Sequence, residues 1–299
     1  MPQAKRFSGI YAPIATVFNE NDTIDWKAME TNIAYYNQTR LAGVVVLGSN
    51  GEFALLSHAE KVDLIAFVHQ HLSSDKRLIA GSGCESTAET ILLGKEAAEA
   101  GADAALVVTP WYYKGSYSDS VLERHYQIIA DDSPLPVMLY NMPRNTGVNI
   151  SAALAAKLAK HPNIIGIKDS SGDIVQITNT INNTPDHFTV FAGSGSFLMA
   201  TIQAGGDGGT LAIANIMPNE CVQLYEAALA SDTVKARELQ QRIMQPNAAV
   251  TSGLGIPGLK KALDLIGLRG GMPRKPLLPL SDTESEKLML VLRNAGLDV

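Results

Sequence analysis

The sequence predicts a closed (β/α)8 TIM barrel with a C-terminal helical extension, and three observations lead to this fold class. Short apolar runs alternate with longer stretches of helical periodicity, which is typical of a parallel sheet built from βαβ units. Eight such units fit before residue 231, and eight is the number that closes a barrel. A barrel takes about 250 residues, and this chain has 299. An open, doubly wound sheet shares the alternation and stays open as the competing architecture.

The expected strands are short apolar runs, each bounded by polar or turn-forming residues. Strands that are buried on both faces show such continuous runs because neither face meets water. In chain order, the expected strands cover Gly9–Ile14, Gly43–Leu47, Arg77–Ala80, Ala104–Val108, Val137–Tyr140, Ile164–Lys168, Thr189–Ala192 and Thr210–Ile213.

Two of the helices expected between these strands begin with a capping-box sequence. Ser57-His58-Ala59-Glu60 and Ser86-Thr87-Ala88-Glu89 each place a serine three residues before a glutamate. In that spacing each side chain can cap the backbone N–H of the other residue. The helix that follows Ser86 is expected to end at Gly101, because glycine commonly follows the last helical turn.

The chain is expected to divide at residue 230. Residues 1–230 hold the eight strand–helix units and form the catalytic barrel. Residues 231–299 contain three further helical patterns, over Val234–Ile243, Pro257–Ile266 and Asp282–Asn294. No linker rich in Ser, Gly or Pro precedes them, so we expect this helical region to pack on the barrel.

Composition and charge exclude several classes of function. The net charge is −6 without a cluster of Lys or Arg, so the basic surface that nucleic acids need is missing. No stretch approaches ~18 consecutive apolar residues, so no segment is expected to span a membrane. The chain has only two cysteines, Cys84 and Cys221, and no apolar signal segment. Both features predict a cytoplasmic protein. The six histidines lack the spacing of a metal-binding motif, so we expect neither a metal ion nor a cofactor.

Lys168 is the residue that most directly indicates chemistry. It ends the apolar run Ile164–Lys168, which predicts a buried strand. Burial in low-dielectric surroundings disfavours the charged form of an amine. The neutral amine is the form that attacks a carbonyl carbon to give a Schiff base. The structural alternative is an ion pair between Lys168 and Asp169 at the edge of a loop.

Polar or glycine-rich sequences also follow other strands, where the chemistry of a barrel gathers. Tyr140 ends the strand before that of Lys168, and a phenol can both donate and accept a proton; otherwise it plugs the barrel mouth. The loop Gly48–Glu52 offers closely spaced N–H groups that suit a carboxylate, unless it is an ordinary strand-to-helix turn. The aromatic loop Thr109–Tyr113 indicates an oligomer contact more than catalysis.

These same residues resemble the dihydrodipicolinate synthase/N-acetylneuraminate lyase family of class I, pyruvate-handling aldolases. The resemblance covers nearly the whole chain, and it is carried by Gly48–Glu52, Val107–Tyr112, Tyr140–Pro143 and Gly166–Asp169. It implies a (β/α)8 barrel with a C-terminal helical part, assembled as a homotetramer from two tight dimers. The implied partner is a small-molecule 2-oxo acid, and neither a nucleic acid nor a membrane is expected.

The resemblance also implies roles for individual residues. Lys168 matches the Schiff-base lysine, and Tyr140 matches the acid–base phenol. Ser49, together with the backbone of Asn50, matches the group that holds the pyruvyl carboxylate. Tyr112 matches a tyrosine that reaches the neighbouring subunit's site as part of a proton relay.

Three further residues are assigned to the substrate pocket. Gly193 matches a glycine that lines the pocket in the family. Ser170 follows the strand of Lys168, and Asn145 follows the strand of Tyr140. We expect both side chains to contact the substrate, because strand ends form the site of a barrel enzyme.

Two features depart from the synthases of this family. Ser49 and Asn50 stand where the synthases usually carry paired threonines. Asn145 stands where they carry an arginine for the carboxylate of the second substrate, and Arg144 lies one residue earlier. The family's 4-hydroxy-2-oxoglutarate aldolases match better, over Gly48–Phe53, Ala80–Thr87, Asn145–Gly147, Pro246–Thr251 and Gly255–Lys261.

The predicted reaction is therefore retro-aldol cleavage of a 4-hydroxy-2-oxo acid to pyruvate and an aldehyde. The resemblance favours 4-hydroxy-2-oxoglutarate, which gives glyoxylate. The alternatives are an aldolase or dehydratase for 2-keto-3-deoxy sugar acids, a dihydrodipicolinate synthase, and a catalytically silent barrel that binds or regulates.

Overall fold

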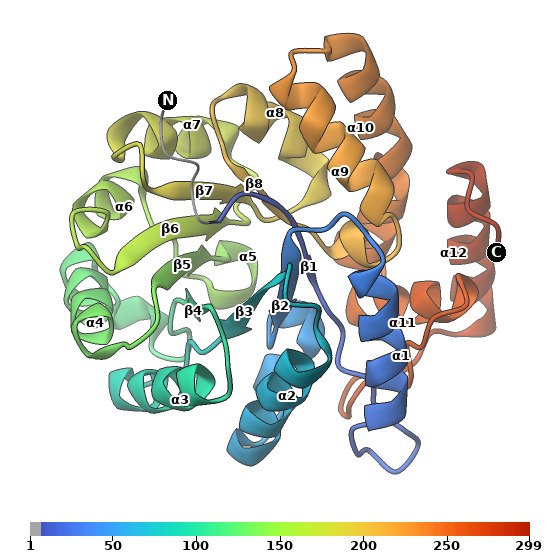
Figure 1. Ribbon diagram of the computed structural model, residues 1–299, viewed down its shortest axis with the longest axis horizontal. Helices are drawn as coiled ribbons and strands as arrows, with labels where there is room; N and C mark the ends of the chain where they lie inside the picture. The colour runs from blue at the N-terminus through green and yellow to red at the C-terminus, as the bar shows by residue number, and fades with distance from the viewer. Residues whose placement is uncertain (1–6) are drawn as a thin grey trace.

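The structure is a computed structural model that describes residues 7–299, and it confirms the predicted closed barrel. Eight parallel strands follow one another around the barrel in chain order, and β8 closes it against β1. Figure 1 shows the strands at the centre with helices around them. The strands are β1 Gly9–Pro13, β2 Gly43–Val46, β3 Arg77–Gly81, β4 Ala104–Val108, β5 Val137–Asn141, β6 Ile164–Asp169, β7 Thr189–Ala192 and β8 Gly208–Thr210.

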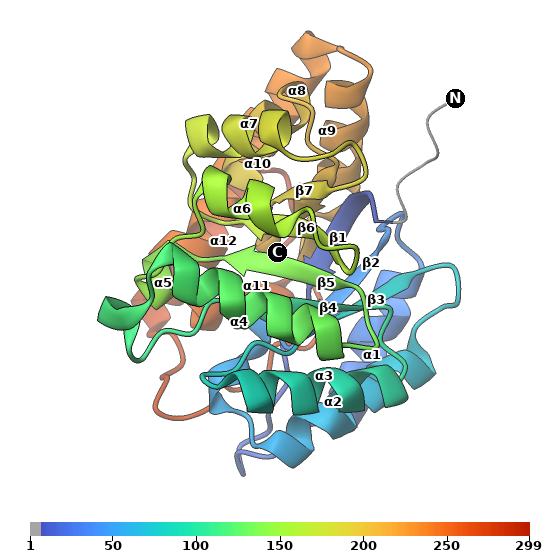
Figure 2. The same ribbon diagram turned by 90° about the vertical axis from the view of Figure 1, so that its left-hand side faces the viewer.

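Eight helices follow the strands and cover the outside of the barrel (Figures 1 and 2). They are α1 Trp26–Asn37, α2 His58–His71, α3 Thr87–Glu99, α4 Asp119–Asp132, α6 Ala152–Leu158, α7 Ile174–Asn183, α8 Leu198–Gln203 and α9 Pro218–Leu229. A single extra turn, α5 Pro143–Thr146, directly follows β5. Because each helix returns the chain to the start of the next strand, all strand ends that carry the predicted site face the same side.

The last strand lies earlier in the chain than the sequence predicts. The apolar pattern predicts Thr210–Ile213, whereas β8 is Gly208–Thr210 and a 3₁₀ turn begins at Ala212. A Cβ atom at Gly208 would lie 1.9 Å from the Gly9 carbonyl oxygen, so only glycine lets the two backbones approach this closely. The prediction misplaced β8 because it followed apolar residues, and this strand is built from glycine.

The helix caps show one prediction that holds and one that holds in part. Ser57 and Glu60 form the reciprocal capping box at the start of α2. Ser86 caps α3 by accepting the Glu89 N–H, but the Glu89 carboxylate contacts His58 instead of returning to Ser86. The positive φ of Gly101 agrees with the predicted glycine after α3.

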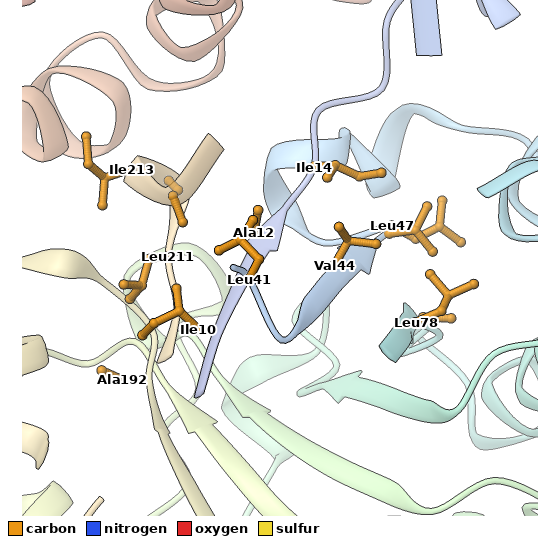
Figure 3. Close-up of a cluster of buried hydrophobic side chains, with 14 of the residues drawn as sticks. Ile10, Ala12, Ile14, Leu41, Val44, Leu47, Leu78, Ala192, Leu211 and Ile213 are labelled. Atoms are coloured by element: carbon orange, nitrogen blue, oxygen red, sulfur yellow. The ribbon is translucent and has the colours of Figure 1, made fainter. Parts of the chain in front are cut away.

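Side chains of each strand alternate between the barrel interior and the layer under the helices. A small interior cluster includes Tyr11, Met138 and Phe191. The larger cluster lies between strands and helices, and Figure 3 shows part of it around Ile10 and Ala12. The same alternation directs Tyr140 and Lys168 inward, because their strand neighbours pack in the outer cluster.

The C-terminal helices are present and lie beside the barrel (Figure 1). They are α10 Thr233–Ala248, α11 Gly255–Leu265 and α12 Asp282–Asn294, with a π-helical turn Ala249–Gly253 between the first two. Two contacts join them to barrel loops: Gln240 donates to the Gly195 carbonyl at 2.7 Å, and Lys260 donates to the Thr16 carbonyl at 2.7 Å. The proposed domain boundary falls in the short connection between α9 and α10.

Candidate active site

A cavity of about 270 Å³ opens where β2, β3, β4 and β5 end. Its wall contains Ser49 from the loop after β2, Tyr140 from β5 and Asn145 from α5. Ile256, at the start of α11, adds a residue from the C-terminal helices. This is the side of the barrel on which the sequence places the chemistry.

Lys168 and Tyr140 lie directly opposite each other on β6 and β5. Both side chains point into the barrel and are almost fully buried, at 3% and 5% exposure. Lys168 Nζ lies 4.0 Å from the centroid of the Tyr140 ring, and Tyr140 in turn lines the cavity. The register of a parallel sheet therefore brings the predicted nucleophile and the predicted proton carrier together.

The Tyr140 hydroxyl lies in surroundings that favour its ionised form. Burial alone raises the pKa of Tyr140, but the positive charge of Lys168 and a hydrogen bond with Ser49 outweigh that effect and lower the pKa below its usual value. The hydroxyl and Ser49 Oγ are 3.2 Å apart. A phenol with a lowered pKa takes up and releases protons more readily near neutral pH.

The loop after β2 has an unusual backbone. Ser49–Gly51 forms a 3₁₀ turn, and the residues on either side of the loop, Leu47 and Glu52, have φ values of 60° and 57°. Non-glycine residues rarely adopt this conformation, and such residues gather at functional sites. Asn50 Nδ2 is buried with no hydrogen-bond partner in the part of the chain that the structure describes. The loop therefore holds an open donor where the sequence predicts carboxylate binding.

Asp169 does not pair with Lys168, so the structural alternative for the lysine is wrong. The two residues point to opposite faces of β6. The Asp169 carboxylate accepts hydrogen bonds from Asn141 Nδ2, the Ser171 N–H and hydroxyl, and Gln176 Nε2. These contacts tie β5, the β6–α7 loop and α7 together behind the amine.

Gly193 and Ser170 lie against each other at the ends of β7 and β6. A Cβ atom at Gly193 would lie 1.9 Å from Ser170 Oγ and 2.7 Å from the Asp169 carbonyl oxygen. Any larger residue at position 193 would therefore push Ser170 away. Ser170 Oγ is buried, and its interaction with the Tyr140 hydroxyl helps to lower the pKa of Tyr140, so Ser170 belongs to the same cluster.

Tyr112 does not join this cluster within a single chain. Its side chain is 75% exposed and packs against the ring of Tyr113. The loop itself is fixed, because the Glu85 carboxylate accepts the N–H groups of Trp111 at 3.0 Å and Tyr112 at 3.0 Å. The predicted reach of Tyr112 into a neighbouring subunit stays a prediction.

A buried charge cluster behind the β2 loop is not evident from the sequence. Glu52 Oε1 forms an ion pair with Lys260 Nζ at 2.7 Å, and Glu52 Oε2 accepts the Arg274 N–H at 2.8 Å. The Arg274 guanidinium reaches Glu60 Oε1 at 2.6 Å. Lys260 and Arg274 lie so far along the chain from Glu52 that no local pattern indicates the contact. The one available signal was a lysine within the predicted apolar helix after Pro257.

Within residues 7–299 no helix is long and apolar enough to cross a membrane. The same residues contain no group of three or more His, Cys, Asp or Glu side chains that could hold a metal ion.

The fold and the site define a class of protein: a (β/α)8 barrel enzyme in which a buried amine and a phenol meet at the ends of β5 and β6. The family model of the dihydrodipicolinate synthetase family matches residues 6–295, and the chain belongs to that family. Its members are pyruvate-using lyases and aldolases, so the family predicted from the sequence is confirmed.

Individual relatives match over almost their full length. The 4-hydroxy-tetrahydrodipicolinate synthase of Archaeoglobus fulgidus is 34% identical over 97% of this chain and 99% of its own. A mitochondrial protein of Emericella nidulans, named probable 4-hydroxy-2-oxoglutarate aldolase, is 35% identical over 94% of this chain and 92% of its own. The chloride-inhibited dihydrodipicolinate synthase of Acinetobacter baumannii, solved with pyruvate, superposes with a TM-score of 0.92 at 32% identity, covering 99% of this chain and 100% of that one.

Proposed function

We propose that this protein is a class I aldolase that cleaves a 4-hydroxy-2-oxo acid to pyruvate and an aldehyde through a Schiff base on Lys168. The observation that carries the proposal is a cluster at the cavity: Ser49 and Tyr140 line it, and the Lys168 amine lies 4.0 Å from the centroid of the Tyr140 ring. Membership of a family of pyruvate-using lyases and aldolases supports it.

The proposed reaction begins at the Lys168 amine. Its nitrogen attacks the C2 carbonyl of the substrate, and loss of water leaves an iminium ion. Tyr140 takes the proton from the C4 hydroxyl, the C3–C4 bond breaks, and its electron pair moves toward the iminium nitrogen. The aldehyde leaves, and the remaining enamine is protonated at C3 and hydrolysed to pyruvate and free Lys168. The lowered pKa of Tyr140 suits this proton transfer.

The C1 carboxylate of the substrate is assigned to the loop after β2. Ser49 Oγ is within hydrogen-bond distance of the Tyr140 hydroxyl, and Asn50 carries a buried donor without a partner. A carboxylate accepts such donors, and Ser49 contacts the same tyrosine that lies against the Lys168 amine. Gly193 packs against Ser170 at the ends of β7 and β6, and Asn145 lines the cavity.

The aldehyde half of the substrate is proposed from sequence similarity. Ser49 and Asn50 replace the paired threonines of the synthases, and Asn145 replaces their arginine. The Emericella nidulans relative supports 4-hydroxy-2-oxoglutarate, with glyoxylate as the second product. The Archaeoglobus fulgidus relative favours the alternative, in which pyruvate condenses with an aldehyde in a synthase reaction. A 2-keto-3-deoxy sugar acid is the third candidate.

Borohydride trapping tests the covalent step. The protein is incubated with pyruvate, reduced, digested and examined by mass spectrometry, and the expected adduct lies on Lys168. Lys168→Ala should lose both the adduct and turnover. Normal turnover by Lys168→Ala would overturn the proposal. Pyruvate release is then followed for 4-hydroxy-2-oxoglutarate and several 2-keto-3-deoxy sugar acids, and condensation of pyruvate with aspartate semialdehyde is assayed in parallel.

The assembly and location complete the proposal. The exposed Tyr112 and Tyr113 side chains form an apolar patch that suits contact with a second copy of the chain, which supports the predicted homotetramer. Sedimentation of the purified protein decides between a tetramer, a dimer and a monomer. Cys84 and Cys221 are both free and buried, which agrees with a cytoplasmic protein.

A further inference from the structure

The carboxylate of Glu52 lies buried behind the loop that carries Ser49 and Asn50. Both of its oxygens are held by the C-terminal part of the chain: Oε1 by Lys260 Nζ and Oε2 by the Arg274 N–H. The side chains of Glu52 and Lys260 are 0% and 1% exposed. A buried charge pair of this kind keeps its geometry only if the remaining donors and acceptors are also satisfied.

Lys260 Nζ lies 2.7 Å from each of three oxygen atoms. Besides Glu52, its Nζ donates to the Thr16 carbonyl at 2.7 Å and to the Met272 carbonyl at 2.7 Å. Thr16 in turn donates from Oγ1 to the Gly51 carbonyl at 2.7 Å. Lys260 therefore holds the loop at two consecutive residues, through Glu52 directly and through Gly51 by way of Thr16.

The loop needs such support because its backbone is strained. Glu52 lies in the left-handed region at φ 57°, as does Leu47 at φ 60° on the other side of the loop. A strained conformation persists only where surrounding contacts over-determine it. Ser49 and Asn50 lie between these two residues, so the orientation of their side chains depends on how both ends of the loop are held.

We propose that Lys260 is a positioning residue for the carboxylate-binding loop: it fixes Glu52 and Gly51, and thereby aims Ser49 and Asn50 at the substrate carboxylate. Its ammonium group contacts neither Lys168 nor Tyr140 in the described contacts, so it acts through the loop. The inference rests on the function proposed above. Burial lowers the pKa of Lys260 and the Glu52 carboxylate opposes that shift, which accords with a pair whose two charges depend on each other.

Lys260→Met tests the inference, because methionine fills similar space without donors. We expect the pyruvate concentration for half-maximal borohydride trapping, and KM, to rise about tenfold or more, while kcat falls less than about threefold. Lys76→Met is the matched control. Lys76 is also a buried lysine, 6% exposed, but it donates to the Thr39 and Leu41 carbonyls before β3 begins, at the opposite side of the barrel.

The control separates positioning from general loss of stability. We expect Lys76→Met to lower the melting temperature without changing KM. Equal KM changes in the two variants, or an unchanged KM in Lys260→Met, would overturn the inference. If Lys260→Met does not fold, Glu52→Gln/Lys260→Met leaves no unpaired buried charge, and a raised KM in this double variant supports the same conclusion.

Hydrogen exchange keeps this test independent of the proposed function. Exchange in the peptide covering residues 48–56 should become faster in Lys260→Met and stay unchanged in Lys76→Met. If wild-type protein gives no pyruvate adduct, the proposed function fails, but faster exchange confined to this loop still supports the anchoring. An unchanged exchange rate in Lys260→Met refutes the anchoring whatever the reaction is.

Discussion

Tyr140→Phe removes one oxygen atom and keeps the ring against which Lys168 packs at 4.0 Å. The hydroxyl is 3.2 Å from Ser49 and has a lowered pKa. General acid–base catalysis contributes about 10²–10⁴-fold to rate. We therefore expect kcat to fall by about 10²–10⁴-fold, which corresponds to about 3–5 kcal/mol of activation free energy. The lost hydrogen bond costs only about 1 kcal/mol of folding stability.

The assay follows pyruvate release by coupling it to lactate dehydrogenase and recording NADH oxidation. Tyr126→Phe is the matched control, since Tyr126 is fully buried and its hydroxyl donates to the Val107 carbonyl at 3.3 Å, away from the cavity. Both variants should lose similar stability, but only Tyr140→Phe should lose turnover. In the wild type, kcat should rise with pH along a limb whose midpoint lies below 10 and which Tyr140→Phe lacks. Turnover of Tyr140→Phe within about threefold of the wild type would refute the role of the phenol.

Three other substitutions test the packing of the site, the packing of α3 and the contacts of His58. Gly193→Ala places a Cβ atom 1.9 Å from Ser170 Oγ, so kcat/KM should fall about tenfold or more. Gly94→Ala adds a Cβ atom where there is open space, so it should stabilise α3 by up to ~1 kcal/mol in thermal melts. Hydrogen bonds with Glu96 and Glu89 raise the pKa of His58, so its stabilising effect is complete below pH ~6.5 and fades as pH rises through the folded-state pKa. Melting temperatures of wild type and His58→Ala should therefore differ most at acidic pH, and an equal difference at all pH values would contradict this.

The barrel could be predicted because its signals are local. The apolar runs that end in Tyr140 and Lys168 predict two buried strands, and they also predict which residue lies at the end of each strand. Parallel register then determines which residues meet, since Tyr140 pairs directly with Lys168. The bounds of β8 were predicted wrongly because Gly208 allows the close approach of β8 to β1, and apolar patterns do not show that requirement.

The anchors of the site were not predictable, because they depend on contacts between distant parts of the chain. Lys260 lies in a helix beside Lys261, and the sequence does not show that one of the two lysines is buried against Glu52. Glu89 has the spacing of a capping box, but it contacts His58 of the neighbouring helix, because a side chain at a helix start can choose a tertiary partner. Tyr112 needs a second chain to show what it contacts.

The contacts of Glu52 in the β2 loop with Lys260 and Arg274 have a consequence for synthesis of the chain on the ribosome. Ser49, Tyr140 and Lys168 are all made before the last strand of the barrel. The partners of Glu52, Lys260 and Arg274, are translated only near the C-terminal end of the chain. Lys168 is thus synthesised before the partners of Glu52, and the β2 loop gains its full set of contacts only when the chain is almost complete.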